Sequence, residues 1–306
     1  WAWNRLEWPT VERFAGEHDV VHSQSPMLIP ARAAKVVTIH DLDFLKHPQQ
    51  MTAEIRRDYP ALARSHAARA DAVMVSSRYA AAEVIRELQV EPSRVHVCSP
   101  GPPLWTEAVR DARVADAGAA PRGEHLLFVG TLNERKNVGT LLKAYRVLRE
   151  RVSDAPPLVL AGHRTPAFEQ WAPLCNEGAL RGHVTITGYV DTARRVELYQ
   201  GAHMLILPSY DEGFGLPVLE AMACGVPVVI SSRGSLPEVA GDAAVPIDPN
   251  DVDGFATAMQ ALLDPDRARA AITQGVSRAA TYNWTTGAIA ARQAYQSAIE
   301  VHARRH

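Results

Sequence analysis

Two carboxylates bracket a glycine-rich loop in the stretch SYDEGFGLPVLEAMACGVP, residues 209–227. Glu212 lies just before a predicted helix, and Glu220 is placed in its first turn, with seven residues between them. Pro217 suits the start of a helix, and the glycines let the backbone approach a ligand closely. The first amides of a helix lack acceptors within the helix, and the helix dipole is positive at that end. The loop therefore predicts an anion-binding site, flanked by two carboxylates that can accept hydrogen bonds from hydroxyl groups.

Two cations stand in a second loop of the same kind. VGTLNERKN, residues 129–137, follows a predicted strand and places Arg135 and Lys136 side by side after Gly130. Lys136 is one of only four lysines in the chain, so its position is informative. Fixed cations stabilise the charge that develops on a departing phosphate. Position alone leaves two non-functional interpretations open. Arg135 and Lys136 can be an ordinary solvated pair, and Glu220 can serve only to interact favourably with the dipole of its helix.

The first third of the chain offers one comparable element, VVTIHDLDFLKHP at residues 36–48. His40 and Asp41 are expected at the carboxyl end of a strand, where ligands gather in α/β folds. A purely structural role for His40 stays open. The DLD at 41–43 can also indicate a divalent-ion site. The same D-x-D spacing recurs twice near the end of the chain, however, so we favour no metal.

Short apolar runs alternate with helix-like stretches, which predicts an α/β fold with parallel sheets to position these loops. Strands are expected at residues 19–25, 35–41, 71–77, 94–101, 125–131, 157–162, 184–190, 204–209 and 226–232. Helices are expected at residues 52–70, 79–89, 137–151, 166–177, 192–201, 216–224, 251–263, 266–281 and 285–303. Ser77 is predicted to cap the second of these helices.

Composition and pattern divide the chain into two domains. Residues 1–103 form the first, residues 104–124 are rich in Pro, Ala and Gly and are predicted to be a linker, and residues 125–283 form the second, before a final helix at 284–306. A nucleotide-binding fold normally opens with a strand and a tight glycine loop, which the first domain lacks. We therefore expect the first domain to be incomplete.

The bulk numbers exclude several classes of protein. With 47% hydrophobic and 22% charged residues the chain is globular, and a net charge of −2 gives no general attraction to nucleic acid. Three widely separated cysteines, no signal pattern and no apolar run long enough for a membrane span predict a cytoplasmic protein. Association with the inner face of the membrane stays open. The excess of Arg and Ala favours a bacterial source.

The string EGFGLPVLEAMACGVPVV resembles the signature of the large family 4 of retaining glycosyltransferases. The match is without a gap at seven positions: Glu212, Gly213, Phe214, Gly215, Leu216, Pro217 and Glu220. The resemblance implies the GT-B architecture, with two Rossmann-like domains and parallel sheets facing across a cleft. It also implies that Glu212 contacts hydroxyls of the donor sugar, that Glu220 binds the ribose hydroxyls, and that the loop amides meet the diphosphate and sugar.

The resemblance extends to three other elements of the chain. VGTLNERKN is similar to the family's G-x-L-x-x-R-K-N element, which implies that Arg135 and Lys136 lie on the phosphates. In TGYVD, Val190 matches the position that meets the nucleotide base. His40 is implied to lie near the transferred sugar. NWTTGAIAARQAY resembles the family's C-terminal helix, which implies that residues 284–306 pack back on the first domain.

The predicted function is that of a retaining hexosyltransferase acting in glycan or polysaccharide biosynthesis. The resemblance implies a nucleotide diphosphate sugar as donor, with GDP-mannose as first choice and UDP and dTDP sugars open, and no cofactor. A glycan, a lipid-linked glycan or a small molecule is the expected acceptor. A non-catalytic sugar-nucleotide-binding domain or partner subunit, and another GT-B enzyme such as an epimerase or a phosphorylase, remain alternatives. NAD binding is disfavoured, because Val218 replaces the third glycine that its motif needs.

Overall fold

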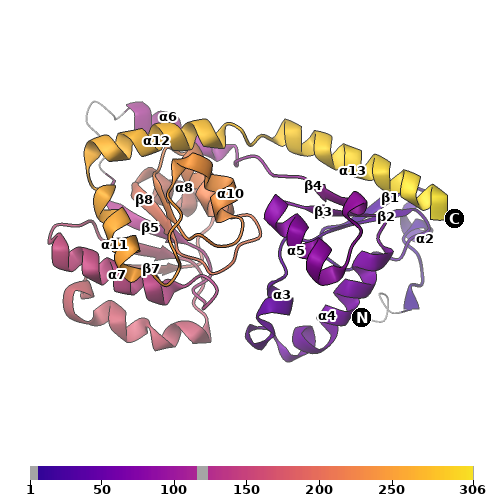
Figure 1. Cartoon of the computed structure of the whole chain (residues 1–306), viewed down its shortest axis with the longest axis horizontal. Coiled ribbons are helices and arrows are strands. Elements are labelled where there is room, and N and C mark those ends of the chain that lie inside the picture. Colours follow the sequence, from indigo (N-terminus) through magenta and orange to yellow (C-terminus); the bar gives the residue numbers. More distant parts are fainter. Residues whose placement is uncertain (1–5, 116–122, 306) are drawn as a thin grey trace. The chain divides into compact units, whose positions relative to one another are not determined.

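The computed structural model describes residues 6–115 and 123–305. The chain divides into two compact units (Figure 1). Unit 1 consists of Trp1–Gly101 together with Asn283–His306, and unit 2 consists of Pro102–Tyr282. Each unit holds one parallel sheet with helices packed on it. The predicted α/β fold with two Rossmann-like domains is therefore confirmed.

Unit 1 is built on a four-stranded parallel sheet in the order β1-β2-β3-β4. Its strands are β1 (Val20–Ser23), β2 (Ala34–Thr38), β3 (Ala72–Val75) and β4 (Val95–Val97). Its helices are α2 (Glu12–Ala15), α3 (Asp43–Lys46), α4 (Ala53–Arg69), α5 (Arg78–Leu88) and α13 (Trp284–Arg305), with short 3₁₀ turns at Pro48–Gln50 and Pro92–Arg94. Ser77 caps α5, as predicted, by accepting a hydrogen bond from the amide of Ala80 at 3.0 Å.

The alternation of side chains along the strands gives this sheet two apolar faces. On one face, Val37 and Val73 join the core made with α4 and α5. On the other face, Val36 packs with Ala294 and Ala298 of α13. The small side chains of α13 let the helix lie close to the strands. The last helix of the chain is thus part of the first unit.

Unit 2 contains a five-stranded parallel sheet in the order β7-β6-β5-β8-β9. Its strands are β5 (His125–Val129), β6 (Leu158–Ala161), β7 (Val184–Gly188), β8 (Ala202–Leu207) and β9 (Val228–Ile230). Its helices are α6 (Trp105–Ala115), α7 (Val138–Arg151), α8 (Thr192–Gln200), α9 (Leu216–Ala223), α10 (Leu236–Ala240), α11 (Val252–Ala261) and α12 (Pro265–Ala279). Helix α7 packs on α11 (Figure 1), and α9 packs on α12.

The strand order of unit 2 determines where a ligand can bind. The chain runs outward from β5 through β6 to β7, then returns to the other side of β5 with β8 and β9. The order therefore reverses between β5 and β8, and in open α/β sheets ligands bind beyond the carboxyl ends of the strands at such a switch point. The loops after β5 and β8 are the two that carry Lys136 and Glu212.

Two segments differ from the sequence-based expectation. Within the predicted linker 104–124, helix α6 packs on α8 and α9, with Val109 buried in the core; residues 116–122 lie outside the described residues. The helix predicted at 166–177 is instead a series of 3₁₀ turns: Pro166–Gln170, Ala172–Asn176 and Gly178–Leu180. Pro173 removes an amide donor in the middle of this segment, which explains why no α-helix continues through it.

None of the helices in the described parts of the chain has both the length and the apolar character needed to cross a membrane.

Candidate functional site

The loop after β5 turns at Gly130, where its backbone lies close to the backbone at the end of β6. Gly130 donates its amide hydrogen to the carbonyl of Ala161 at 2.9 Å. A Cβ at Gly162 would lie 1.8 Å from the carbonyl oxygen of Gly130, so only glycine fits there. The loop ends at Asn137, which adopts a left-handed conformation with φ of 54°. Its side-chain amide donates to the carbonyls of Pro208, at 3.0 Å, and Pro249, at 2.7 Å, in two other loops.

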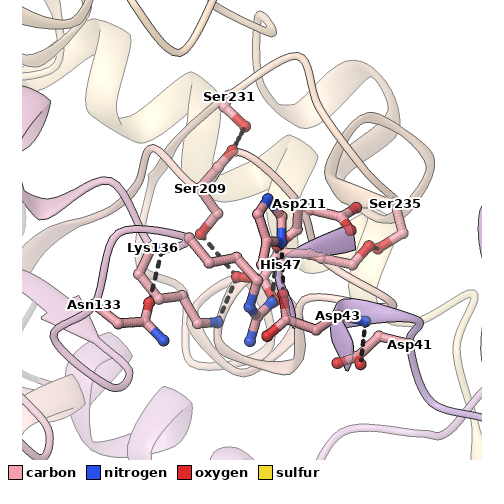
Figure 2. Close-up of polar contacts among 11 residues, drawn as sticks. Asp41, Asp43, His47, Asn133, Lys136, Ser209, Asp211, Ser231 and Ser235 are labelled. Atoms are coloured by element: carbon pink, nitrogen blue, oxygen red, sulfur yellow. Dashed lines mark hydrogen bonds and ion pairs between the residues drawn. The ribbon is translucent and has the colours of Figure 1, made fainter. Parts of the chain in front are cut away.

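Glu212 is the point on which the two predicted loops converge. Lys136 Nζ donates to its Oε1 at 2.5 Å, and Ser209 Oγ donates to the same oxygen at 2.7 Å; Figure 2 labels both donors. Arg135 Nη1 lies 3.4 Å from Oε2 and 2.8 Å from the carbonyl oxygen of Asp211. Lys136 and Glu212 are only 8% and 6% exposed. The carboxylate and both cations therefore form one buried, charge-paired cluster.

The backbone that carries Glu212 is fixed from the segment after β9. Ser235 donates from its amide, at 3.0 Å, and from its hydroxyl, at 2.9 Å, to the carbonyl of Glu212. Gly234 has φ of +65°, and a Cβ there would lie 2.5 Å from the amide nitrogen of Glu212. Neither Gly234 nor Ser235 was predicted from the sequence. Their one local signal is the GS pair that follows a predicted strand.

Glu220 lies on α9, but in the second turn rather than the first. The helix begins at Leu216, with Pro217 in the first turn and no acid there. The predicted start of the helix at residue 216 is thus correct, but Glu220 is its fifth residue and lies just beyond the first turn. Glu220 is only 2% exposed, so it is not a solvated acid that merely interacts with the dipole at the start of the helix. Its partners are Tyr199, whose hydroxyl is 2.8 Å from Oε2, and Arg195, whose Nη1 is 3.1 Å from Oε1.

Burial determines how this second carboxylate ionises. Removal from water raises the pKa of Glu220, and the charge of Arg195 and the hydrogen bonds from Tyr199 and Arg195 oppose the rise. The pKa of Tyr199 is raised well above its usual value, first by burial and then by the neighbouring Glu220. The tyrosine is therefore a hydroxyl donor at neutral pH. Neither Tyr199 nor Arg195 was identified from the sequence, because each lies more than twenty positions from Glu220.

The loop between Glu212 and α9 turns on Gly215. This residue has φ of 92°, and a Cβ there would lie 2.6 Å from a side-chain methyl of Leu236. Phe214 is buried and meets the ring of Tyr282 edge-to-face, with centroids 5.6 Å apart. Leu216 is half exposed at the start of the helix. Phe214 therefore anchors the loop in the core, and the carbonyl of Gly215 accepts a hydrogen bond from the amide of Val218, in the first turn of α9, at 2.9 Å.

Val190 borders an open hollow after β7. The hollow has a volume of about 600 Å³ and is lined by Thr187, Tyr189, Val190, Asp191 and Arg194. Val190 itself is buried, whereas the Tyr189 side chain is 83% exposed. The hollow leads into α8, whose N-cap is Asp191. The same helix carries Arg195 and Tyr199, so α8 connects the hollow with Glu220.

The remaining predicted site residue, His40, belongs to unit 1. It is exposed, two residues beyond the end of β2. The neighbouring acids are engaged locally: Asp41 accepts a hydrogen bond from the amide of Asp43 at 3.1 Å, and Asp43 lies 2.8 Å from His47 Nδ1 (Figure 2). These contacts begin the short helix α3. Among the described residues, three or more acidic, histidine or cysteine side chains are nowhere grouped as a metal site would require.

The structure is that of a protein with two Rossmann-like units, with Glu212 among two cations at the switch point of unit 2. Residues 110–277 match the family of glycosyl transferases group 1, and residues 2–101 match the glycosyl transferase 4-like domain. The chain is a member of the group 1 glycosyltransferase family.

Two curated relatives illustrate the family. The O-antigen chain mannosyltransferase B of Escherichia coli is 31% identical over 277 residues, a match covering 87% of this chain and 71% of that enzyme. D-inositol 3-phosphate glycosyltransferase 2 of Catenulispora acidiphila is 31% identical over 243 residues, covering 76% of this chain and 57% of the relative. The chain is thus shorter than both relatives.

Solved structures agree on the GT-B fold. The sucrose-phosphate synthase of Thermosynechococcus elongatus superposes with a TM-score of 0.74 at 25% identity, covering 93% of this chain and 74% of that one. Anabaena HepE, solved in complex with UDP and glucose, also gives a TM-score of 0.74, at 17% identity, covering 92% of this chain and 79% of that one. The second likeness concerns the fold alone.

Proposed function

We propose that this protein is a retaining hexosyltransferase, which moves a hexose from a nucleotide diphosphate sugar to an acceptor hydroxyl. The observation that carries the proposal is the convergence of Arg135 and Lys136 on Glu212 at the switch point of unit 2. The cluster combines cations suited to a diphosphate with a carboxylate suited to sugar hydroxyls, where α/β folds bind nucleotides.

In the proposed reaction the bond between the sugar C1 and the β-phosphate oxygen breaks, and a bond from C1 to the acceptor oxygen forms on the same face. The transition state has oxocarbenium character. The departing diphosphate oxygen takes the proton of the acceptor hydroxyl. No side chain is required as a nucleophile in this scheme, and the protein acts by holding the leaving group and the sugar.

Arg135 and Lys136 are proposed to stabilise the negative charge that develops on the diphosphate. They are held before any ligand binds, Lys136 by Glu212 and Arg135 by the carbonyl of Asp211, so little reorganisation is needed during reaction. Glu212 orients the donor sugar, and His40 of unit 1 is proposed to contact the same sugar. Gly130, at the turn after β5, allows the phosphates to approach the backbone.

Glu220 is proposed to bind the ribose hydroxyls, and Val190 with its hollow to receive the base. The amides of Gly213, Phe214, Gly215 and Leu216 are proposed to contact the diphosphate and sugar. The raised pKa of Glu220 does not prevent this role, because ribose hydroxyls replace lost water as hydrogen-bond donors. The hollow and Glu220 are linked by α8, which is consistent with one nucleotide spanning both.

GDP-mannose is the proposed donor, supported by the similarity to a mannosyltransferase that builds O-antigen chains. A growing polysaccharide or lipid-linked glycan is the corresponding acceptor, used at the cytoplasmic side of the membrane. UDP sugars are the main alternative, since the fold is shared with a protein solved with UDP and glucose.

A two-stage experiment tests the proposal. Thermal shifts with GDP, UDP, dTDP and ADP sugars identify the donor, because a ligand selective for the folded state raises stability by mass action. The selected donor is then incubated with candidate acceptors, and the anomeric configuration of the product is read by NMR. Retention supports the proposal, inversion overturns it, and tight binding without transfer indicates a sugar-nucleotide-binding protein instead.

A further inference from the structure

Glu220 is held by two side chains that differ in their access to solvent. Tyr199, the eighth residue of α8, has no exposed surface, and its hydroxyl lies 2.8 Å from Oε2. Arg195, one turn earlier on the same helix, has a side chain that is 36% exposed, and its Nη1 lies 3.1 Å from Oε1. Each carboxylate oxygen of Glu220 therefore has one side-chain partner. The partner of Oε2 is fixed inside the core, and the partner of Oε1 is partly exposed to solvent.

The tyrosine hydroxyl has one proton to donate and two acceptors within reach. The carbonyl of Pro217 is 3.3 Å away, farther than Glu220 Oε2, so the carboxylate takes the stronger hydrogen bond. The ring is fixed by core packing, with its centroid 5.5 Å from that of Trp105. Because the ring cannot move, its hydroxyl determines the rotation of the Glu220 carboxylate.

Arg195 is held less tightly than Tyr199. It contributes one of its five N–H groups to Glu220, and its Nε is buried without a hydrogen-bond partner. Its side chain is 36% exposed, whereas Tyr199 has no exposed surface. Of the two partners of Glu220, Arg195 is therefore the one that can move aside into solvent and free Oε1.

We propose that Tyr199 is a positioning residue for nucleotide recognition. Its hydroxyl holds Oε2 of Glu220 from the core side and leaves Oε1 to accept hydrogen bonds from the ribose hydroxyls. Arg195 is the partner that these hydroxyls displace from Oε1. This inference rests on the proposed function, in which Glu220 binds ribose. Tyr199 touches no substrate itself. It acts by fixing the direction and the charge of the carboxylate that does.

The first test compares ribonucleotides with their 2′-deoxy forms. Calorimetry measures the affinities of GDP against 2′-deoxy-GDP and of UDP against 2′-deoxy-UDP. In the wild type the 2′-hydroxyl is expected to improve affinity by roughly tenfold or more, as for a hydrogen bond to a charged group. In Tyr199→Phe this ratio is expected to fall below about threefold, because the carboxylate is free to rotate. An unchanged ratio in Tyr199→Phe overturns the inference.

Tyr145→Phe is the matched control. Tyr145 is also fully buried in unit 2, and its hydroxyl donates to a backbone carbonyl, that of Pro156, at 2.9 Å. Both variants lose one buried hydrogen bond, so both are expected to lower the melting temperature. Only Tyr199→Phe should reduce the preference for the 2′-hydroxyl. Equal preferences in the two variants would show that Tyr199 contributes stability alone.

The pH dependence of nucleotide affinity distinguishes a positioning role of Tyr199 from a purely structural one. The titratable or charged groups that influence Glu220 are Arg195 and Tyr199 on α8 and Cys224 one turn along α9. Burial keeps Cys224 a neutral thiol by raising its pKa. Because the hydrogen bond from Tyr199 lowers the pKa of Glu220, its removal should make nucleotide affinity fall at a higher pH during acidification. A wild-type profile in Tyr199→Phe contradicts the inference.

Two further variants distinguish this inference from the proposed function. Glu220→Gln should lose the 2′-hydroxyl preference; if it keeps that preference, the ribose role of Glu220 is wrong and the inference falls with it. If Glu220→Gln loses the preference and Tyr199→Phe keeps it, only the inference is overturned. Arg195→Gln alters a half-exposed side chain and should fold; it is expected to retain the preference above neutral pH, and its loss there would make Arg195, not Tyr199, the positioning residue.

Discussion

Lys136 Nζ lies 2.5 Å from Glu212 Oε1, although the two residues are 76 positions apart in the chain. The contact joins the loop after β5 to the loop after β8, the two strands that flank the switch point. Both side chains are buried, and removal of either one takes the close counter-ion away from a charge inside the protein. The pair therefore links the stability of unit 2 to its proposed chemistry.

Lys136→Ala should lower both stability and turnover. Loss of a buried partner costs about 3–5 kcal/mol, and loss of one charge-stabilising donor lowers kcat by about 10²–10³. Lys143→Ala, an exposed lysine on the neighbouring helix α7, is the control and should change neither quantity. Chemical denaturation and steady-state kinetics with the donor measure the two effects. A Lys136→Ala enzyme with wild-type kcat would remove Lys136 from the leaving-group role.

The combination Lys136→Met with Glu212→Gln should be less destabilising than the sum of the two single changes. Loss of Lys136 leaves Glu212 with Arg135 as its cation at 3.4 Å, and loss of the Glu212 charge leaves Lys136 without its close counter-ion, whereas the double change removes both members of the pair. A double-mutant cycle by denaturant unfolding measures the coupling. Additive single effects would mean that the close contact contributes nothing to stability.

Gly234→Ala should displace the Glu212 loop. The new Cβ would lie 2.5 Å from the amide nitrogen of Glu212, in addition to the cost of a left-handed conformation at φ of +65°. Gly182→Ala is the control, with φ of +76° and nothing within 4 Å of its Cβ. Unfolding and donor affinity should both be affected more strongly at Gly234. Equal effects in the two variants would show that the clash is relieved without moving Glu212.

The stability of the ligand-free protein should change with pH in a way that Glu220 determines. Its folded-state pKa is raised above the unfolded value of 4.5, so the ionised carboxyl destabilises the fold above that raised pKa. As pH falls through the raised pKa toward 4.5, the wild type should gain stability relative to Glu220→Gln. Melting temperatures of both proteins measured from pH 8 to pH 4.5 check the sign. A constant difference would mean that Glu220 titrates normally.

EDTA should leave transfer activity unchanged. The two acids that could suggest a divalent-ion site, Asp41 and Asp43, already accept from the amide of Asp43 and pair with His47 respectively. Asp43→Asn should therefore affect the stability of unit 1 rather than any ion requirement. Activity assays with EDTA, and with added Mn²⁺ or Mg²⁺, provide the measurement. Strict dependence on either ion would reverse this assignment.

Local sequence patterns predicted the strands and the loops that follow them. The apolar runs before Gly130 and Ser209 are buried strands, because central parallel strands have no solvent-facing side. Parallel pairing then brings their carboxyl ends to one edge, which is why Lys136 and Glu212 meet. Residue roles at this site remain predictions.

The missed features depend on contacts that no local pattern encodes. Helix α6 has the composition of a linker, but Val109 is buried in the core and Arg113 donates to the carbonyls of Gln200 and Ala202. The local sequence gives no sign of the role of Tyr199, because its contact with Glu220 forms only when α8 and α9 come together in the fold. The start of α9 at residue 216 was predicted correctly, but Glu220 is the fifth residue of the helix and lies just beyond its first turn.

Helix α13 makes unit 1 depend on both ends of the chain, since Ala294 and Ala298 cover a face formed by Val36 and Met74. During synthesis, the strands of unit 1 and all of unit 2 are made before α13, so the face of the first sheet that α13 covers is made long before its cover. The sheet of unit 1 keeps one apolar face bare until α13 emerges, and a nascent chain stalled before α13 would expose that face to chaperones. Deletion of α13 should therefore destabilise the unit whose strands are made first.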